Sequence, residues 1–421
     1  MKKIKLFTLG CKVNQYETQG IREKFLNAGF RENNSEKTDV YIINTCTVTR
    51  QADRESRHLI RKALKVNPEA KVIVTGCYVE KDADELLQIS DRIQIIPNQQ
   101  KHRIVDFLSL TRYKRLATSD RSFIPLSISE FHGHERAFVK IQDGCDNFCA
   151  YCKVPLVRGE SRSRSLKEIT KEVAGLVDRG FKEVVLTGIC LGDYHYRNLG
   201  LADVVGSLAK IKAEFRIRLS SIEPQLISDK LIEKMASSAK ICPHLHIPLQ
   251  SGDNQILQKM NRRYTAKDYL SLIAKIKKKI KDIAITTDVL IGFPGESDRN
   301  FQCTVHCLEE ISPLRTHIFS FSPREGTAAF NLAARIEPQI VKERVGLLKE
   351  VAQKSSHKFR KRFLGRKLTV LIESRADKES RTFCGYSENY IRVIVTGASA
   401  KDVNKLLPVK IKTVDIHSTK T

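Results

Sequence analysis

Short apolar runs alternate with amphipathic segments along residues 1–110. The apolar runs cover residues 3–9, 39–44, 71–75 and 93–96. Helical periodicity covers the stretches between them, at residues 15–28, 50–66 and 81–88. Repeated strand–helix units of this size predict a parallel sheet with helices on both faces.

A second strand–helix series fills residues 134–362, after a stretch at 111–133 that loses the periodicity and that we interpret as a linker. The predicted strands of this series are 137–142, 183–186, 216–220, 244–247, 284–291 and 317–321. Six units over roughly 230 residues predict a (β/α)6 partial barrel. Residues 363–421 change to short strand patterns at 368–372, 390–395 and 409–411, which predict a small β-barrel. The predicted fold class is therefore α/β with a C-terminal β-barrel.

The chain is strongly basic, with 73 Lys and Arg against 48 Asp and Glu and a formal net charge of +25. Such an excess favours a polyanionic partner, and nucleic acid is the first expectation. An anionic membrane surface is the alternative, but no basic amphipathic helix with bulky anchors stands out. The positive charge is densest per residue in 361–421, which favours this segment for part of the contact.

The N-terminus, MKKIKLFTLG, is basic, but its short apolar run leads directly into the first strand–helix unit. It is therefore interpreted as a strand and not as a signal peptide. No apolar stretch approaches the ~18 to 20 residues that a membrane span needs. The expectation is a cytoplasmic protein with no membrane partner.

Three of the 11 cysteines, Cys145, Cys149 and Cys152, lie close together in DGCDNFCAYC, directly after the first predicted strand of the second series. In a reducing cytosol such thiols indicate metal ligation or redox chemistry and not disulfides. Three thiolates can hold three corners of a cube-shaped iron–sulfur cluster and leave the fourth iron open to a small ligand. A zinc site with a fourth ligand elsewhere is the alternative.

Three further cysteines, Cys11, Cys46 and Cys77, each end a predicted strand of the first series. Because the carboxyl ends of parallel strands open on one edge of a sheet, we expect these thiols to converge. Gly10 and Gly76 precede two of them and allow tight turns. The pattern predicts a second cluster with an open iron, and the alternative is that the cysteines only pack as small hydrophobic residues.

The remaining cysteines are predicted to pack in the core; they are Cys190, Cys242, Cys303, Cys307 and Cys384. The basic runs KIKKKIKD (275–282) and KFRKRFLGRK (358–367) are most simply solvated faces. The second run enters the tail domain, where it is also a candidate phosphate contact.

The segments TLGCKVNQYET, INTCTV, TGCY, GCDNFCAYCKVP, RGESRSR, LSSIEP, HLHIPLQSGDNQILQKMNRRYT and IGFPGES resemble, in this order, the methylthiotransferase family of radical S-adenosylmethionine (SAM) enzymes. The motif GCKVNQYET and the Leu–Gly pair in ICLGDY are similar to the branch that acts on threonylcarbamoyladenosine in tRNA. The branches for isopentenyladenosine and for a ribosomal protein aspartate have different residues around the first cysteine. The resemblance covers nearly the whole chain.

The resemblance implies three domains: an auxiliary-cluster domain at 1–110, a radical SAM partial barrel at 134–362 and an RNA-binding TRAM β-barrel at 363–421. It implies two [4Fe-4S] clusters, one on Cys11, Cys46 and Cys77 and the other on Cys145, Cys149 and Cys152. The implied SAM contacts are Tyr151, Thr187, Gly188, Glu223, Gln250, Gly292 and Gly295.

Two of these expectations have plainer alternatives. The glycines at 292–295 fit a simple turn equally well. His246 is expected to face the same barrel mouth as Gln250, although a lone strand histidine is more often a satisfied core group.

The implied reaction adds a methylthio group to carbon 2 of the adenine at position 37, in the anticodon loop of tRNA. The catalyst is a radical generated on SAM at the Cys145/Cys149/Cys152 cluster. Two SAM molecules are used per turnover, one as radical source and one as methyl donor. A one-electron reductant such as flavodoxin or ferredoxin is required, and the enzyme is expected to be a monomer. The sequence names no sulfur source.

The rival hypotheses are the same chemistry on isopentenyladenosine or a ribosomal protein aspartate, and a non-catalytic RNA-binding protein stabilised by zinc.

Overall fold

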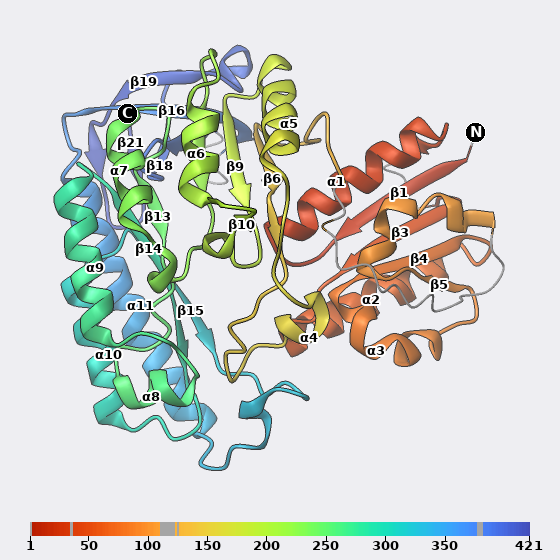
Figure 1. Cartoon of the computed structure of the whole chain (residues 1–421), viewed down its shortest axis with the longest axis horizontal. Helices are drawn as coiled ribbons and strands as arrows, with labels where there is room; N and C mark the ends of the chain where they lie inside the picture. Colours follow the sequence, from red (N-terminus) through yellow and green to blue (C-terminus); the bar gives the residue numbers. More distant parts are fainter. Residues whose placement is uncertain (1, 34–36, 110–122, 124–125, 377–381) are drawn as a thin grey trace.

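In the computed structural model, the N-terminal apolar runs form neighbouring strands of one parallel sheet, as predicted (Figure 1). The strand order is β2-β1-β3-β4-β5, with β1 Lys3–Thr8, β2 Arg31–Glu32, β3 Val40–Thr45, β4 Lys71–Gly76 and β5 Ile93–Ile95. The helices between the strands are α1 Lys12–Asn27, α2 Arg50–Val66 and α3 Cys77–Leu87. Every residue of β3 is buried, which explains why its first four residues are apolar without alternation.

The structure describes residues 2–33, 37–109, 123, 126–376 and 382–421. The predicted linker is therefore described only in part, because 111–122 and 124–125 lie outside the described residues. Within the described ranges no helix is both long and apolar enough to cross a membrane.

The second series forms a partial barrel of six parallel strands, in two three-stranded sheets ordered β12-β9-β6 and β13-β14-β15. Its strands are β6 Arg136–Lys140, β9 Glu183–Thr187, β12 Arg216–Leu219, β13 His244–His246, β14 Ala284–Ile291 and β15 Arg315–Ser320. Parallel bridges from Ile217 to Ile241 and from Ser221 to His246 join the two sheets. Its helices are α4 Val154–Arg158, α5 Leu166–Asp178, α6 Leu201–Ala209, α7 Asp229–Ser237, α8 Asn254–Lys259, α9 Ala266–Lys279 and α10 Asp298–Ile311.

The predicted strand at 137–142 proves to be two elements. Strand β6 ends at Lys140, and the next strand, β7 Gln142–Asp143, leaves the barrel to pair antiparallel with β8 Arg162–Ser163. This short hairpin brackets the cysteine-rich loop and α4. A second hairpin pairs β10 His195–Tyr196 with β11 Leu199–Gly200. The short 3-10 helices are η1 Asn98–Arg103, η2 Asp106–Ser109, η3 Leu191–Asp193, η4 Pro224–Leu226, η5 Ala328–Asn331 and η6 Ala400–Asp402.

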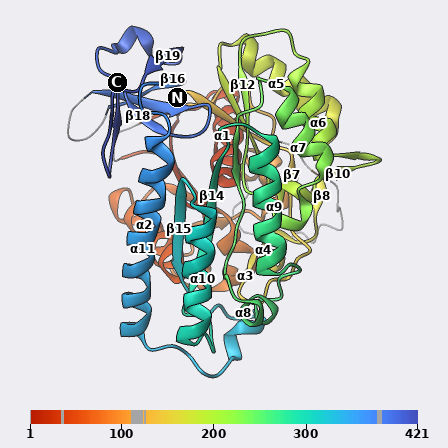
Figure 2. The ribbon, with the colours of Figure 1, turned by 90° about the vertical axis from the view of Figure 1, so that its left-hand side faces the viewer.

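A long helix, α11 Pro338–Lys361, runs beside β15 and α10 and leads to the C-terminal sheet (Figure 2). That sheet has the order β19-β16-β17-β18-β21-β20, mostly antiparallel, with β16 Lys367–Ala376, β17 Phe383–Ser387, β18 Arg392–Ile394, β19 Leu406–Lys410, β20 Thr413–Val414 and β21 Thr419–Lys420. It docks on the barrel through buried charges. Arg216 and Arg218 bind the carboxylate of Glu183 and donate to backbone carbonyls of Tyr386 and Ser387.

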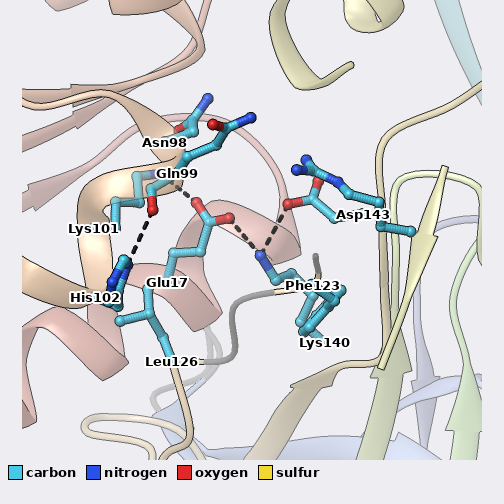
Figure 3. Close-up of a pocket in the computed structure, with 10 residues that line it drawn as sticks. Glu17, Asn98, Gln99, Lys101, His102, Phe123, Leu126, Lys140 and Asp143 are labelled. Carbon is cyan, nitrogen blue, oxygen red and sulfur yellow. Dashed lines mark hydrogen bonds and ion pairs between the residues drawn. The ribbon is translucent and has the colours of Figure 1, made fainter. Parts of the chain in front are cut away.

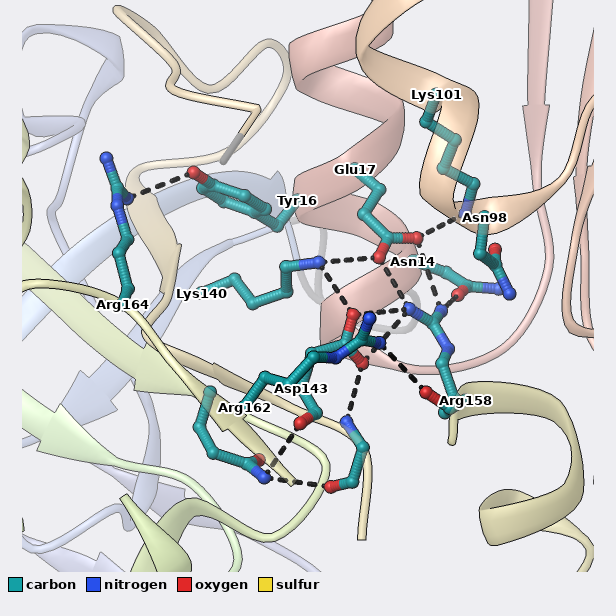
Figure 4. Close-up of polar contacts among 12 residues, drawn as sticks. Asn14, Tyr16, Glu17, Asn98, Lys101, Lys140, Asp143, Arg158, Arg162 and Arg164 are labelled. Atoms are coloured by element: carbon teal, nitrogen blue, oxygen red, sulfur yellow. Dashed lines mark hydrogen bonds and ion pairs between the residues drawn. The ribbon is translucent and has the colours of Figure 1, made fainter. Parts of the chain in front are cut away.

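The N-terminal sheet is held against the barrel by buried ionic side chains (Figures 3 and 4). Glu17 on α1 accepts hydrogen bonds from Lys101 on η1, from Lys140 at the end of β6 (2.9 Å) and from Arg158 at the end of α4 (2.5 Å). Lys140 also reaches Asp143 at 3.0 Å. The side chains of Glu17, Lys101, Lys140 and Arg158 are each no more than 5% exposed. The small pocket in Figure 3 is lined in part by the residues of these ion pairs.

The charges of this network set the protonation state of Glu17. Burial acts to raise the pKa of the Glu17 carboxyl, but Arg158, Lys101 and Lys140 together hold that pKa well below its usual value. With Asp143 included, three cations face two carboxylates. We refer to these five residues as the interface network; it carries one positive charge that its own members do not balance.

A second group of polar contacts crosses the same interface, and Figure 4 shows one of them, the hydrogen bond from Arg164 to the hydroxyl of Tyr16. Glu172 on α5 accepts from the hydroxyl of Tyr16 on α1 at 3.1 Å and from Arg164. The same carboxylate accepts from the backbone N–H of Ile128 at 2.8 Å. Helix α1 is therefore attached to the barrel through two adjacent residues, Tyr16 and Glu17.

Replacing Glu17 with Gln should destabilise the fold strongly, because Lys101, Lys140 and Arg158 would keep their charges without their shared carboxylate. Breaking one partner of a buried ion pair costs about 3–5 kcal/mol. The change is measured from the urea unfolding transition. The control is Glu55→Gln on the exposed face of α2, which should stay within about 0.5 kcal/mol of the unchanged protein.

The same carboxylate should also make the protein acid-sensitive. Since the folded pKa of Glu17 is depressed, its contribution is present above the unfolded pKa of ~4.3 and is lost as pH falls toward the folded value. A pH series of unfolding midpoints should therefore fall less steeply below about pH 4 in the Gln variant. Parallel curves for the two proteins would contradict this assignment.

Candidate functional site

The three cysteines of the N-terminal sheet gather at its carboxyl edge. Cys11 caps the start of α1, Cys46 follows β3 directly, and Cys77 is the first residue of α3. The three thiols are close enough to influence one another. Burial raises the pKa of the Cys46 thiol to about 11, and charge on Cys77 and Cys11 acts in the same direction. We refer to these residues as the auxiliary triad.

Two glycines make this convergence possible. Gly10 and Gly76 have φ values of +93° and +105°, which side chains other than glycine rarely adopt. A Cβ on Gly10 would lie 2.9 Å from the sulfur of Cys46, and one on Gly76 would lie 2.3 Å from the carbonyl oxygen of Thr45. The prediction of tight turns before the first and third cysteines is confirmed.

The interface network reaches the auxiliary triad through Arg158. Its Nε donates to the sulfur of Cys77 at 3.2 Å, while its Nη1 binds Glu17. Asn14 orients the guanidinium by accepting from Nη2, and its own amide donates to the carbonyl of Thr45 at 3.0 Å. A thiolate at Cys77 would balance the unpaired positive charge of the network. Burial raises the pKa of the Cys77 thiol, and Arg158 acts against that rise. Arg158 is therefore placed to stabilise the deprotonated form, which is the form that binds iron.

The second group of cysteines lies on the loop between β7 and α4. The backbone N–H of Cys145 donates to the carbonyl of Gly159 at 3.0 Å, and that of Cys152 to the carbonyl of Cys149 at 2.9 Å. Arg262 donates to the sulfur of Cys149 at 3.2 Å. We refer to Cys145, Cys149 and Cys152 as the barrel triad. Each triad thus has one thiol that accepts from an arginine.

A fourth thiol lies beside the barrel triad, and the sequence analysis assigned it only to packing. The amide of Asn147 is 3.5 Å from the sulfur of Cys145 and 3.4 Å from that of Cys190. A hydrogen bond from Cys190 lowers the pKa of the Cys145 thiol to about 7. The available sequence signal was that Cys190 follows the end of β9, the strand next to β6.

The donor sets of both triads fit iron–sulfur clusters. In the described part of the chain, no three His, Cys, Asp or Glu side chains gather closely enough to hold a single metal ion. A cube binds its thiolates at separate corners and needs them further apart than one ion does. Buried thiols with arginine N–H groups on their sulfurs match the hydrogen bonding that such clusters receive.

Several of the expected SAM contacts surround the barrel triad. Burial raises the pKa of the Tyr151 hydroxyl well above its usual value, next to Arg262. Glu223 forms an ion pair with the same arginine, which joins it to Cys149. A Cβ on Gly188 would lie 2.8 Å from the side-chain oxygen of Gln142, so this position permits only glycine without movement.

The remaining expected contacts lie on other strand ends. Thr187 ends β9 and is buried. Gln250 follows β13 with a φ of +62° and donates its backbone N–H to Asp288 at 2.8 Å. Such a conformation in a residue with a side chain is uncommon and is typical of functional sites.

The glycines at 292 and 295 have a clear local role. Both have positive φ values, +75° and +81°. The backbone N–H of Gly292 donates to Glu296 at 2.9 Å, and Glu296 in turn binds Arg344 on α11. The turn interpretation accounts for these glycines without a ligand, and their contact with SAM stays a prediction.

His246 lies inside the barrel and is satisfied by protein groups. Its Nε2 is 3.0 Å from Asp288, and its Nδ1 is 2.9 Å from the hydroxyl of Thr286. His317 binds the other oxygen of Asp288 at 3.4 Å.

Comparisons with known proteins agree with this arrangement. Residues 139–308 match the radical SAM superfamily, and residues 3–97 match a family described as uncharacterized protein family UPF0004. A solved radical SAM methyltransferase from Kitasatospora setae has the same fold, with a TM-score of 0.57, 13% identity and coverage of 76% of this chain and 73% of that one.

Curated relatives cover the whole chain. The threonylcarbamoyladenosine tRNA methylthiotransferase of Chlamydia pneumoniae is 36% identical over 98% of this chain and 96% of its own length. A tRNA-2-methylthio-N(6)-dimethylallyladenosine synthase of Oceanobacillus iheyensis is 32% identical over 97% of this chain and 82% of its own length. The chain therefore belongs to the radical SAM methylthiotransferase family, in the branch of the threonylcarbamoyladenosine tRNA methylthiotransferases.

Proposed function

We propose that this protein adds a methylthio group to carbon 2 of N6-threonylcarbamoyladenosine at position 37 of tRNA, with SAM as cosubstrate. We assign two [4Fe-4S] clusters to it, one on each cysteine triad. The observation that carries the proposal is the connection between the triads. Cys152 precedes α4 by two residues, and Arg158 at the end of that helix donates to Cys77. One helix of five residues thus fixes the barrel triad relative to the auxiliary triad.

The bound groups would supply the one-electron step, the sulfur and the methyl group, none of which a side chain can provide. The protein's own residues would hold these groups and orient them. Arg262 pairs with the Glu223 carboxylate and keeps it beside the barrel triad, where it could accept hydrogen bonds from a bound cosubstrate. Asn14 and Arg158 fix the auxiliary triad from the opposite side. Burial of the interface network keeps bulk water from this side of the site.

A groove of about 390 Å³ lies next to the auxiliary triad, and both cations and carboxylates line it. Lys153 and Arg324 are paired there with Asp82 and Asp53, so we assign the contact with tRNA phosphates to Arg50 and Arg54. Lys153 and Arg324 both reach Thr47, the residue after Cys46. Unstacking the target adenine costs a few kcal/mol, and phosphate contacts offset that cost. A one-electron reductant such as flavodoxin or ferredoxin completes the reaction.

The two triads should have separable roles. Cys149→Ala should abolish SAM cleavage, whereas Cys46→Ala should retain SAM cleavage and lose thiolation. Anaerobically reconstituted protein should hold about eight irons, and each variant about four. Cys303→Ala, a matched control on α10, should keep both activities and all iron. Thiolation by the Cys46 variant would contradict the two-cluster assignment.

The substrate is tested on nucleosides from tRNA. Mass spectrometry of tRNA from cells that lack the gene should show threonylcarbamoyladenosine without its methylthio derivative, and the intact gene should restore the derivative. Because the unmodified precursor accumulates, the expected change is complete and not partial. Loss of a methylthio group from isopentenyladenosine would instead favour the other tRNA branch.

A further inference from the structure

A cavity inside the barrel is lined by none of the six triad cysteines. It has a volume of about 40 Å³, and its lining includes Lys12, Arg218, Ser220, His244, His246 and Tyr390. These residues come from the start of α1, from the barrel strands β12 and β13 or the residue just after β12, and from the C-terminal domain. Lys12 directly follows Cys11, so the cavity begins at the auxiliary triad.

The cavity has a positive field and one free cation. Arg136 and Arg218 are bound by the carboxylates of Glu373 and Glu183, respectively. In the described part of the chain, the ammonium of Lys12 has neither a hydrogen bond nor an ion pair. Burial acts to raise the pKa of the Tyr390 hydroxyl, but nearby cations, Lys12 among them, hold it below its usual value. An anionic group is therefore the ligand that this cavity favours.

Two buried polar atoms on the cavity wall also have no hydrogen-bond partner among the described residues. The hydroxyl of Ser220 and Nδ1 of His244 form no hydrogen bond among the described residues, although the two side chains are only 7% and 3% exposed. Leaving such buried groups unpaired is unfavourable. The ligand should therefore carry hydrogen-bonding groups as well as negative charge.

Tyr390 is held in an unusual conformation at the base of the cavity. Its φ is +68°, and its ring packs on His244 at 4.3 Å and on Tyr386 at 4.8 Å between centroids. A residue with a side chain is rarely found in this region, and surrounding structure must hold it there. The sequence analysis placed Tyr390 at the start of a strand, but this turn delays β18 to Arg392.

We propose that this cavity receives the carboxylate end of the N6 substituent of the target base, and that Lys12 binds that threonyl carboxylate. The proposal rests on the proposed function. Atoms C2 and N6 of adenine flank N1 on one edge of the ring, so a substituent on N6 lies beside the carbon to be modified. Lys12 lies one residue from Cys11, as this geometry requires. A dimethylallyl group offers neither charge nor hydrogen bonds and would leave Lys12, Ser220 and His244 unpaired.

The test is a double-mutant cycle that combines a change at Lys12 with a change at the threonyl carboxylate of the substrate. Reconstituted holoenzyme is titrated by fluorescence anisotropy with an anticodon stem–loop that carries threonylcarbamoyladenosine, or with one whose threonyl carboxylate is converted to a carboxamide. Lys12→Gln and the carboxamide should each weaken binding about tenfold, and the combination should be no weaker than either change alone. Lys12→Arg should retain a preference for the carboxylate.

Two control variants separate this role from general effects. Lys24→Gln removes the same charge from the far end of α1 and should leave binding unchanged. Ser220→Ala should weaken binding of both stem–loops. Because Ser220 lies far from Cys11 in sequence, this variant keeps the proposal testable if Lys12→Gln loses iron.

Independent losses that multiply in the cycle, or unchanged binding by both the Lys12→Gln and Ser220→Ala variants, would overturn the proposal. The proposed function would still hold if cellular tRNA lost its methylthio derivative. Equal binding of both stem–loops by the unchanged protein, together with methylthio transfer to another nucleoside, would instead refute the proposed function.

Discussion

The structure depends on one buried guanidinium. Arg158 shares Glu17 with two lysines and reaches the sulfur of Cys77 with its Nε. Charges buried this deeply are tolerated only when paired, so the N-terminal sheet and the barrel have one favourable arrangement and not a range of them. Since Arg158 ends a helix that starts just after Cys152, the same constraint also sets the position of one cysteine triad relative to the other.

A second set of buried charges acts at the opposite end of the barrel. Glu183 binds Arg216 and Arg218, whose other N–H groups satisfy carbonyls of the C-terminal sheet. The barrel is therefore closed by ionic contacts toward both neighbouring domains, and the cavity at Lys12 and Tyr390 lies between them. An apolar interface would allow the domains to slide, whereas these directional hydrogen bonds fix the position of each neighbouring domain on the barrel.

The sequence predicted the parts of this architecture that follow from local pattern. Apolar runs separated by amphipathic helices gave the parallel sheet, and cysteines at the ends of those runs had to meet at one edge. The interface network could not be predicted, because Glu17 and Arg158 are 141 residues apart and each looks like an ordinary surface charge on an amphipathic helix. Cys190 was missed for the same reason: its partner, Asn147, is distant in sequence. The strand at 137–142 was predicted too long because the pattern does not reveal that β7 pairs outside the barrel.

The relatives themselves indicate where substrate choice must reside. Enzymes named for threonylcarbamoyladenosine and for dimethylallyladenosine are similar to this chain over nearly its whole length, so the triads alone cannot discriminate between the two bases. Discrimination requires groups that one substituent satisfies and the other leaves unpaired. The cavity beside Cys11 offers such groups in the free ammonium of Lys12 and the unpaired atoms of Ser220 and His244. A charged substituent would pair with the cation and the polar atoms of this cavity, whereas an apolar substituent would leave them unpaired. The electrostatics of this cavity, and not the chemistry at the triads, would therefore select the substrate.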